Sequence, residues 1–444
     1  MKKHFASILI LLSVSILFAT GTKEENPTVT TITWWHSNSG LLQDATDTMV
    51  KQFNDTIGKE EGIKVNAVYQ GKASDVLTKA KAIWQGTNYA DLPDIIQLDA
   101  QAIMDLRDNP RLIPAESLAG ENAYDLGQIV ESTRLSQTYK GKMIGMPFNS
   151  STILLYYNKT AFEEAGIAQP PKDIDEMIAD APLLLKKDES GNVMRWAFSG
   201  VPTTYELCAW LGQQNGLSLI CDQNNGHDGI PTKVLFDENG TMETFLAKWK
   251  RLYDTGALEN ATSGVTASFA SGRTTMMLAS TSQLTTVLDM VGNRFEVGVA
   301  YLPRVNDQAT GGVNIGGGAL YALDNGSGHS KAAWKFIEFA VSKEQQLAWH
   351  VATGYFPVNT GTYELDAFKQ HIKGQPLFAT AIQQMQNSNP KLQGIWVPSS
   401  YQIYYAFQSS IMKMLAEGKD IHQATEEMAK EINGYFAAYL ATQQ

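Results

Sequence analysis

The sequence predicts an α/β protein built from two or more packed units. At 444 residues the chain is longer than the ~150 residues of an ordinary domain, which favours two or three units. Strand and helix patterns alternate near the N-terminus as β-α-β-α-β, and this order is typical of a parallel sheet with crossover helices. A second series of strands and helices follows a polar segment at residues 145–159. We therefore expect two sheets, each covered by helices.

The first unit is expected to begin with a strand at residues 29–34 and a helix whose apolar residues recur at helical spacing from Leu42 to Phe53. Alternating apolar and polar residues predict a second strand at 63–69, and Ser74 can cap a second helix before a third strand at 94–98. Ligands bind beyond the carboxyl ends of such strands. The first pocket candidates are therefore residues 35–39, 70–74 and 97–100.

Residues 145–159 predict a polar passage between the two units. Pro147 is expected to end the regular structure before it. Four short hydrogen-bonding side chains follow at Asn149, Ser150, Ser151 and Thr152, ahead of an apolar strand at 153–157.

The second unit shows helix patterns at residues 160–166, 174–187 and 242–253 and strand patterns at 274–279 and 295–301. A glycine-rich segment at 314–321 then leads into a further strand, and 331–341 is amphipathic. Ser342 with Gln345 is typical of a helix start, and Gly354 is expected to end that helix.

The chain begins with a pattern typical of a secretory signal peptide at residues 1–21. Lys2 and Lys3 are basic, residues 5–19 are apolar, and residues 19–21 are small. The apolar run is shorter than the ~20 residues of a membrane span, so we expect export to the periplasm or cell envelope. No cysteine stands at the cleavage point, where a lipid anchor would need one.

The charge and the cysteines limit the partners and the chemistry. Removing the two positive charges of Lys2 and Lys3 takes the formal charge from −11 to −13, which argues against nucleic acid as a partner. Cys208 and Cys221 are the only cysteines. In an oxidising compartment they form either a disulfide or two buried thiols.

Familiar catalytic patterns are missing from the sequence, which has no Gly-x-Ser-x-Gly, His-Glu-x-x-His, Cys-x-x-Cys or phosphate loop. The glycines at 316–318 lack dinucleotide-loop spacing and indicate close backbone approach, either to a packed strand or to a ligand. His36 and His350 stand beside candidate sites, where a single histidine next to tryptophan is more often structural than a base. We expect no metal and no cofactor.

Aromatic residues with small polar neighbours are the strongest binding signal, because aromatic rings stack on sugar faces and short amides and hydroxyls bind ligand hydroxyls. Taken singly, each ring is more often part of a core. The set comprises Trp34, Trp35, Trp196, Tyr205, Trp210, Tyr355, Trp396, Tyr401, Tyr404 and Tyr405.

Several stretches resemble the extracellular solute-binding proteins of ABC importers, and within them the glycerol-3-phosphate-binding type. They are Trp-His-Ser at 35–37, Pro-Phe-Asn-Ser-Ser-Thr at 147–152, Leu-Tyr-Tyr-Asn-Lys at 155–159, Asn-Asn-Gly at 224–226, Ile-Gly-Gly-Gly at 315–318, and Trp-His with Thr-Gly-Tyr between 349 and 355. The resemblance implies a two-lobed periplasmic binding protein of type II, in which each lobe is a mostly parallel sheet flanked by helices. Three hinge crossings are expected near Pro147, at 301–303 and at 353–356. The implied lobes are 22–146 with 303–353, and 147–302 with 354–444.

The resemblance also implies ligand contacts at Ser150 or Ser151, Ser280, the backbone of Gly317 and Gly318, and Tyr355. An aromatic pair is expected near Tyr205 and Trp210. The 35–37 stretch adds Trp35, His36 and Ser37 to the candidate site.

Three positions depart from the family pattern. Ala73 stands where the family has Tyr, Ala100 stands where it has an acidic residue although Asp99 is adjacent, and Tyr404 stands where it has Arg. An Arg fork is the natural partner of a phosphate. Its replacement favours a sugar or another polyhydroxy ligand.

The expected protein is a non-enzymatic, monomeric receptor that hands such a solute to a membrane permease. Binding of glycerol-3-phosphate or a glycerophosphodiester in the same role is the alternative. A secreted glycoside hydrolase is a weaker alternative, since it needs two carboxylates ~5–10 Å apart across the cleft. A surface adhesin would instead expose large apolar patches.

Overall fold

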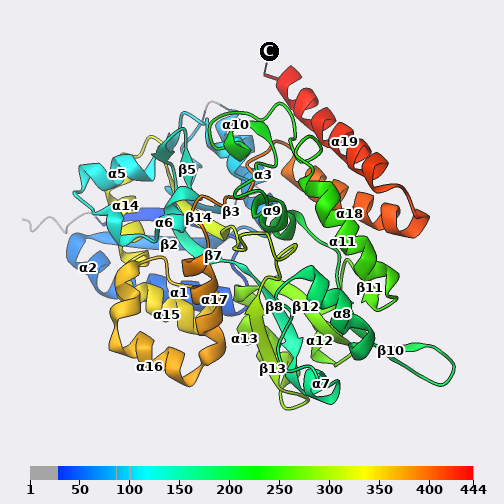
Figure 1. Cartoon of the computed structure of the whole chain (residues 1–444). Helices are drawn as coiled ribbons and strands as arrows, with labels where there is room; N and C mark the ends of the chain where they lie inside the picture. Colours follow the sequence, from blue (N-terminus) through cyan, green and yellow to red (C-terminus); the bar gives the residue numbers. More distant parts are fainter. Residues whose placement is uncertain (1–28, 87, 100–101, 444) are drawn as a thin grey trace, which may run out of the picture.

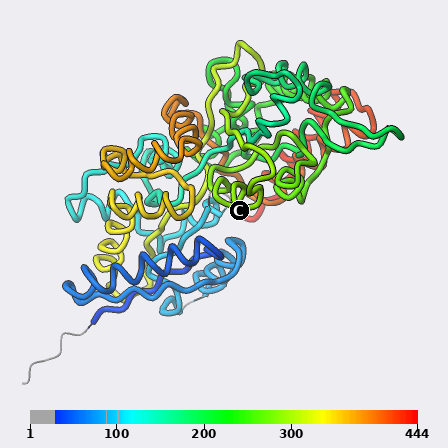
Figure 2. Tube along the Cα trace, turned by 90° about the horizontal axis from the view of Figure 1, so that it is seen from below, coloured from blue at the N-terminus to red at the C-terminus, as the bar shows by residue number. Residues whose placement is uncertain are grey.

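The structure is a computed structural model that describes residues 29–86, 88–99 and 102–443. The expected signal peptide, residues 1–21, and Ala100 lie outside the described residues. The described chain forms two α/β lobes, each organised around a six-stranded sheet (Figure 1). Figure 2 shows the lobes side by side, with the N-terminal segments in one and most of the green and red segments in the other. The predicted α/β, two-lobed fold is confirmed.

The first lobe contains the sheet β2-β1-β3-β14-β4, with β7 added beside β14. Strand β1 pairs in parallel with both β2 and β3, as the β-α-β-α-β order predicts. Antiparallel β14 and β7 complete the sheet. The strands are β1 (Thr30–His36), β2 (Ile63–Tyr69), β3 (Ile95–Asp99), β4 (Leu112–Ile113), β7 (Met146–Ser151) and β14 (Gly316–Leu323), with a small hairpin of β5 (Thr138–Tyr139) and β6 (Lys142–Met143).

Helices cover both faces of the first sheet because alternate strand residues are apolar on each side. Ile32 and Trp34 pack with one set of helices, and Ile96 and Leu98 with another. The first set is α1 (Leu41–Asp55), α5 (Ala115–Glu121), α14 (Ser330–Ala340) and α15 (Lys343–Thr353), and the second is α3 (Ala73–Trp84) and α4 (Ile103–Leu106). Short helices α2 (Ile57–Glu61) and α6 (Glu131–Leu135) complete the lobe.

The second lobe contains the sheet β11-β10-β12-β8-β13, with β9 beside β10. Strands β10, β11 and β12 are parallel, whereas β8 runs antiparallel to β12 and β13. Among the described residues, two strand pairs in each sheet are parallel and three are antiparallel, so the sheets are mixed and not mostly parallel as expected. The strands are β8 (Ile153–Asn158), β9 (Lys186–Lys187), β10 (Val193–Ser199), β11 (Leu258–Glu259), β12 (Thr274–Ser280) and β13 (Val297–Tyr301).

The main core of the second lobe lies on one face of this sheet, where Trp210, Phe245 and Trp249 stack together. It is formed with α8 (Ile174–Leu184), α9 (Thr204–Gly212), α11 (Thr241–Asp254), α18 (Ser400–Glu417) and α19 (Ile421–Ala441). Helices α12 (Val265–Ala270), α13 (Leu284–Val291) and α17 (Pro376–Asn387) cover the other face. The remaining helices are α7 (Lys159–Glu164), α10 (Asp222–Asn225) and α16 (Asp366–Gly374). None of the described helices is long and apolar enough to cross a membrane.

The two cysteines lie in this core as free thiols. Burial raises the pKa of the Cys208 thiol to about 12 and also raises that of Cys221. Because the thiolate is the reactive form, both side chains are held in their unreactive state.

The chain passes between the lobes at places that differ slightly from the expected boundaries. Strand β7 still belongs to the first sheet and β8 to the second, so the first passage falls at Thr152. Val305 and Val313 remain in the second lobe's core, and the second passage follows them, just before β14. After α15, Val358 still packs in the first lobe, and α17 packs on the second.

Pro147 does not end a regular structure as expected but lies inside β7. Strand β7 pairs with β14, and on its other side Ser150 forms an isolated bridge to Phe356. The register of the β7–β14 pair shifts between Gly318 and Ala319, opposite Pro147. Proline has no backbone N–H to donate. It is tolerated here because that position of an edge strand can face a side where no ladder hydrogen bond is made.

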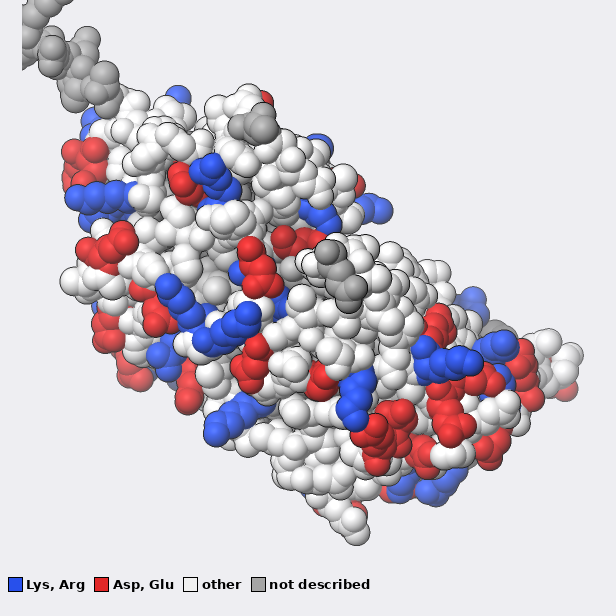
Figure 3. Space-filling view, turned by 90° about the horizontal axis from the view of Figure 1, so that it is seen from above, with Lys and Arg blue, Asp and Glu red and all other residues white. Residues whose placement is uncertain are grey.

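Charged side chains of both signs cover the surface. Figure 3 shows Lys and Arg interspersed with Asp and Glu over both lobes on the face in view. Many of them form exposed ion pairs, such as Arg251 with Asp175 at 3.0 Å. Such pairs contribute at most about 1 kcal/mol each.

Candidate ligand-binding site

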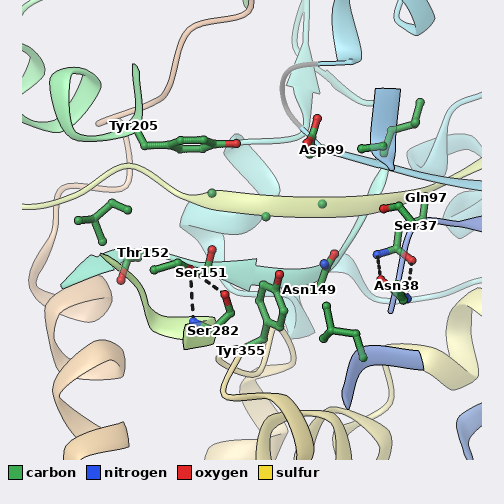
Figure 4. A pocket seen from close by; sticks show the side chains of 18 of the residues that line it. Ser37, Asn38, Gln97, Asp99, Asn149, Ser151, Thr152, Tyr205, Ser282 and Tyr355 are labelled. Carbon is green, nitrogen blue, oxygen red and sulfur yellow. Dashed lines mark hydrogen bonds between the residues drawn. The ribbon is translucent and has the colours of Figure 1, made fainter. Parts of the chain in front are cut away.

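A cavity of about 310 Å³ opens between the two lobes and is lined by both (Figure 4). The carboxyl ends of β1, β2 and β3 all reach it, through Ser37, Ala73 and Asp99. These are the strand ends to which sequence reasoning pointed, since the carboxyl ends of parallel strands meet at one edge of a sheet. The second lobe contributes Ile153, Tyr205, Ser280, Ser282 and Asn314.

Two amides form a fixed pair on the first-lobe wall. Asn38 donates from Nδ2 to Gln97 Oε1 at 3.1 Å, and Gln97 donates from Nε2 to Asn38 Oδ1 at 3.1 Å. Asn38 also donates to Thr46 Oγ1 of α1 at 2.9 Å. Figure 4 shows this pair beside Ser37. Both amides are therefore oriented by the protein before any ligand arrives, which lowers the entropy cost of binding.

His36 supports this wall from behind and does not line the cavity. It is fully buried, and its Nδ1 accepts from the backbone N–H of Asn38 at 3.2 Å. Burial lowers the pKa of His36 to about 4, with Asp47 acting in the opposite direction. The imidazole is thus neutral at physiological pH, and its role is structural.

The crossing strands β7 and β14 form the floor of the cavity. Gly316, Gly317 and Gly318 pair with Ser151, Ser150 and Asn149. Gly317 has φ of +93°, and a Cβ there would lie 1.9 Å from the carbonyl oxygen of Asn149. A side chain is excluded at this point, so the glycine run is explained by close packing of two strands.

Two tyrosines face the cavity from different elements. Tyr205 lies in the first turn of α9, where Thr203 Oγ1 accepts from its backbone N–H at 3.2 Å. Its ring lies against Gly316, and Figure 4 shows its hydroxyl pointing toward Asp99. Tyr355 follows α15, and His350 Nδ1 donates to its carbonyl oxygen at 2.7 Å. Both bonds fix the backbone from which these rings reach the cavity.

Burial raises the pKa of Tyr205, and the nearby Asp99 carboxylate raises it further. Burial also raises the pKa of Tyr355, while hydrogen bonds with Ser282 and Asn149 act against this. Both hydroxyls therefore stay protonated and can donate to a ligand oxygen. The hydroxyls of Ser280 and Ser282 lie 2.9 Å apart at the end of β12.

The structure brings together at the cavity most of the residues singled out from the sequence. They are Ser37, Ala73, Asp99, Ser151, Tyr205, Ser280, Gly317, Gly318 and Tyr355. Lining residues that were not among the predicted ligand contacts include Asn38, Gln97, Asn149, Thr152, Ser282 and Asn314. All but Asn314 stand at a strand end or at the 149–152 passage, so the strand-end signal could have identified them.

Other candidates lie elsewhere. Trp35 and His36 pack in the first lobe, and Ser150 faces a separate recess with His227 and Trp396 because neighbouring residues of a strand point to opposite sides. Trp210 is fully buried and donates from Nε1 to the carbonyl of Pro303 at 2.7 Å. Tyr404 lines a second, smaller cavity.

The charge of the main cavity is carried by one group. Among the described residues that line it, Asp99 is the one carboxylate and none is Lys, Arg or His. A cleft of hydroxyls, amides and tyrosines between two hinged α/β lobes defines a receptor-type binding protein for a small polar solute.

The comparisons with known proteins agree with this class. Residues 48–376 match the family model described as bacterial extracellular solute-binding protein. The chain belongs to this family, which confirms the resemblance, the solute-binding role and the expected export.

The protein is also similar to individual relatives. It is 28% identical over 380 residues to the sn-glycerol-3-phosphate-binding periplasmic protein UgpB of Yersinia pestis, with 82% of each chain covered. Its fold is similar to UgpB of Mycobacterium tuberculosis in complex with glycerophosphocholine (TM-score 0.75, 21% identity, 92% of this chain and 99% of that one). It is equally similar to the cyclic α-maltosyl-1,6-maltose-binding protein of Arthrobacter globiformis (TM-score 0.75, 22% identity, the same coverage). At these identities the two solved structures support the fold alone.

Proposed function

We propose that the protein captures a sugar or another polyhydroxy solute between its lobes and delivers it, as a monomer, to the membrane permease of an ABC importer. The observation that carries this proposal is the lining of the main cavity. Its described polar groups are hydroxyls, carboxamides and one carboxylate, and none is a basic side chain.

This lining suits ligand hydroxyls, which both donate and accept hydrogen bonds. The carboxylate of Asp99 accepts, the serine and tyrosine hydroxyls do either, and the Asn38–Gln97 pair offers fixed amides. The rings of Tyr205 and Tyr355 supply apolar faces for the C–H side of a sugar.

Glycerol-3-phosphate or a glycerophosphodiester is the second candidate, and the names of the relatives favour it. A phosphate dianion in a closed cleft needs a cation, a helix N-terminus or several N–H donors to replace its water. The N-terminal turns of α3 at Ala73 and of α9 at Tyr205 reach the cavity. The glycine backbone is a further source of donors, yet Gly318 pairs with both Asp99 and Asn149 within the sheet. This use of its backbone groups disfavours a phosphate at that point.

Calorimetric titration of the purified protein with monosaccharides, disaccharides, glycerol-3-phosphate and glycerophosphocholine tests the proposal. We expect at least one sugar to bind more tightly than glycerol-3-phosphate. Submicromolar binding of glycerol-3-phosphate without response to any sugar would overturn the choice of ligand. Chromogenic glycosides added to the same sample serve as a control, because release of the dye would indicate the hydrolase alternative.

A further inference from the structure

A second cavity of about 140 Å³ lies in the second lobe beside the main one. It opens at the carboxyl ends of the parallel strands β10 and β11, where Ser199, Ala261 and Thr262 line it. This is the edge at which ligands bind in sheets of this kind. The cavity is less than half the size of the main one, so it suits one ring-sized part of a ligand.

Two elements run directly from the main cavity to the small one. On β12, Ser280 lines the main cavity and Leu278 the small one. Residues two apart on a strand point to the same side, about 6–7 Å from each other. In the first turns of α9, Tyr205 lines the main cavity, and Thr203 and Glu206 line the small one.

Helix α18 also contributes to the small cavity. Tyr401 in its first turn is half-buried, and burial together with the Asp99 carboxylate raises its pKa to about 12. Tyr404 and Gln408 line the small cavity. Because these three residues are spaced by three and four, they lie on one face of the helix. Since β12 and α9 each contribute to both cavities, the two cavities lie close together.

The lining of the small cavity has the chemistry of a sugar subsite. Tyr404 offers a half-buried ring, Phe198 and Trp249 pack in edge-to-face contact at 5.5 Å, and Thr262 offers a hydroxyl. The buried Ser199 hydroxyl already donates to Glu259 Oε2 at 2.5 Å. None of its described lining residues is Lys or Arg.

Glu206 adds one oriented carboxyl group to this lining. Its Oε2 accepts from the backbone N–H of Thr203 at 2.7 Å and from the Thr203 hydroxyl. Like Asp99 in the main cavity, it is a single acidic acceptor among neutral groups. The two cavities thus repeat one pattern of a tyrosine, an acidic group and short polar side chains.

We propose that the small cavity is a second subsite of the binding cleft and that the preferred ligand is a disaccharide or a glycoside with one ring in each cavity. This inference rests on the proposed function, since it presumes a sugar in the main cavity. It also assigns a role to Tyr404, which the main cavity leaves unused.

Matched pairs of sugars test the subsite. The probes are glucose with maltose and trehalose, galactose with lactose and melibiose, and fructose with sucrose, titrated into the wild type and into Tyr404→Ala. We expect one disaccharide to bind at least about tenfold more tightly than its component monosaccharides. Tyr404→Ala should weaken that disaccharide about tenfold, as loss of a stacking ring does, and change monosaccharide affinity less than about twofold.

Two further variants make the test specific. The ring of Tyr405 contacts that of Tyr404 at 5.3 Å, so the control is Tyr435 of α19, which lines neither cavity. Tyr435→Ala should leave both affinities unchanged. Ala261→Phe should fill the small cavity and weaken the disaccharide alone. Unfolding temperatures within a few degrees of the wild type exclude a folding defect.

The outcomes separate this inference from the proposed function. Sugar binding in which monosaccharides match disaccharides, or in which Tyr404→Ala and Ala261→Phe have no selective effect, would overturn the subsite and leave the proposed function standing. Absence of binding by every sugar would overturn both.

Discussion

At the scale of single residues, the cavity separates side chains that can meet a ligand from those that hold them in place. Tyr355 belongs to the first group, because it lines the main cavity at the junction of the lobes. His350 belongs to the second, because its ring donates to the Tyr355 carbonyl and is itself buried. Substitutions in the two groups should therefore change different measured quantities.

Tyr355→Ala should weaken ligand binding by about 1–3 kcal/mol, because it removes a stacking face and a hydroxyl from the cleft. The ring is only partly covered by protein, so the free energy of unfolding should change little. Calorimetry with the bound solute measures the first quantity and thermal unfolding the second. Unchanged affinity in a folded variant would assign Tyr355 to the core.

The buried histidines predict a loss of stability in mild acid. Burial lowers the pKa values of His36 and His350 from 6.5 to about 4 in the folded protein. Between these values the unfolded chain binds protons that the folded chain does not, so the free energy of unfolding falls as the pH drops from about 6.5 toward 4. Above pH 6.5 the effect is absent, since both states are neutral.

Unfolding temperatures measured at pH 7 and pH 5 test whether stability falls in acid as predicted. His36→Asn should reduce the loss, because an amide oxygen can still accept from the Asn38 N–H and does not titrate. His422 is exposed, and the hydrogen bond with Glu243 raises its pKa, so His422→Asn should not reduce the loss. Equal loss in the wild type and in His36→Asn would contradict the assigned role of His36.

Cavity residues could be predicted from the sequence where the direction of a strand alone brings the side chain to the cleft. Ser37, Ala73 and Asp99 follow parallel strands, and any side chain there reaches the same edge. The sequence could not separate Tyr205 from Trp210 on α9, because this helix is apolar nearly all round and its periodicity gives no outward face. Trp210 is buried because of long-range packing, since the ring of Phe245 stacks on it.

At the scale of elements, the pairing of β7 with β14 builds the floor of the cleft and joins the first passage to the second. The glycine pattern at 316–318 predicted close backbone approach, and the structure shows the strand that approaches. The position of Pro147 within β7 could not be predicted, because whether a proline ends a strand depends on which of its sides is paired. Only the tertiary fold supplies that information.

Gly317→Ala should destabilise the protein by at least about 2 kcal/mol, because it combines overpacking with a left-handed backbone conformation. Its new Cβ would meet the Asn149 carbonyl at 1.9 Å. Gly434→Ala on α19 is the matched control, since no atom lies within 4 Å of a Cβ there, and it should stabilise by about 0.5–1 kcal/mol. Chemical denaturation measures both changes. A neutral Gly317→Ala would mean that β7 and β14 can separate at little cost.

At the scale of the whole molecule, the lobes are joined by more than the three chain passages. At the first passage, Thr281 donates its N–H to the Thr152 carbonyl at 2.9 Å, and Gln384 donates to that of Ile153 at 2.7 Å, so the passage is anchored on the second lobe. A second seam joins the lobes directly. There Arg107 of the first lobe donates to the Gly226 carbonyl at 2.6 Å, and Lys140 donates its N–H to the His227 carbonyl at 2.8 Å.

The His227 ring strengthens the second seam. Its nitrogens lie 3.1 Å from the carbonyl oxygens of Thr138 in the first lobe and Gly394 in the second. Trp396 stacks on the ring at 4.4 Å and packs in the first lobe's core. Contacts so thoroughly buried are costly to break, so we expect them to persist while the opposite, polar side of the cleft opens.

We therefore predict that the ligand closes the cleft by a hinge rotation, since only a closed form offers Ser37 and Asp99 from one lobe together with Tyr205 and Ser280 from the other. Small-angle scattering should show a smaller radius of gyration after addition of a solute whose binding calorimetry has established. Glucosamine or another sugar that gives no calorimetric signal serves as the control and should leave the radius unchanged. An unchanged radius with a bound solute would mean that the lobes are already held together without it, and that the seam of Arg107 and His227 fixes their arrangement.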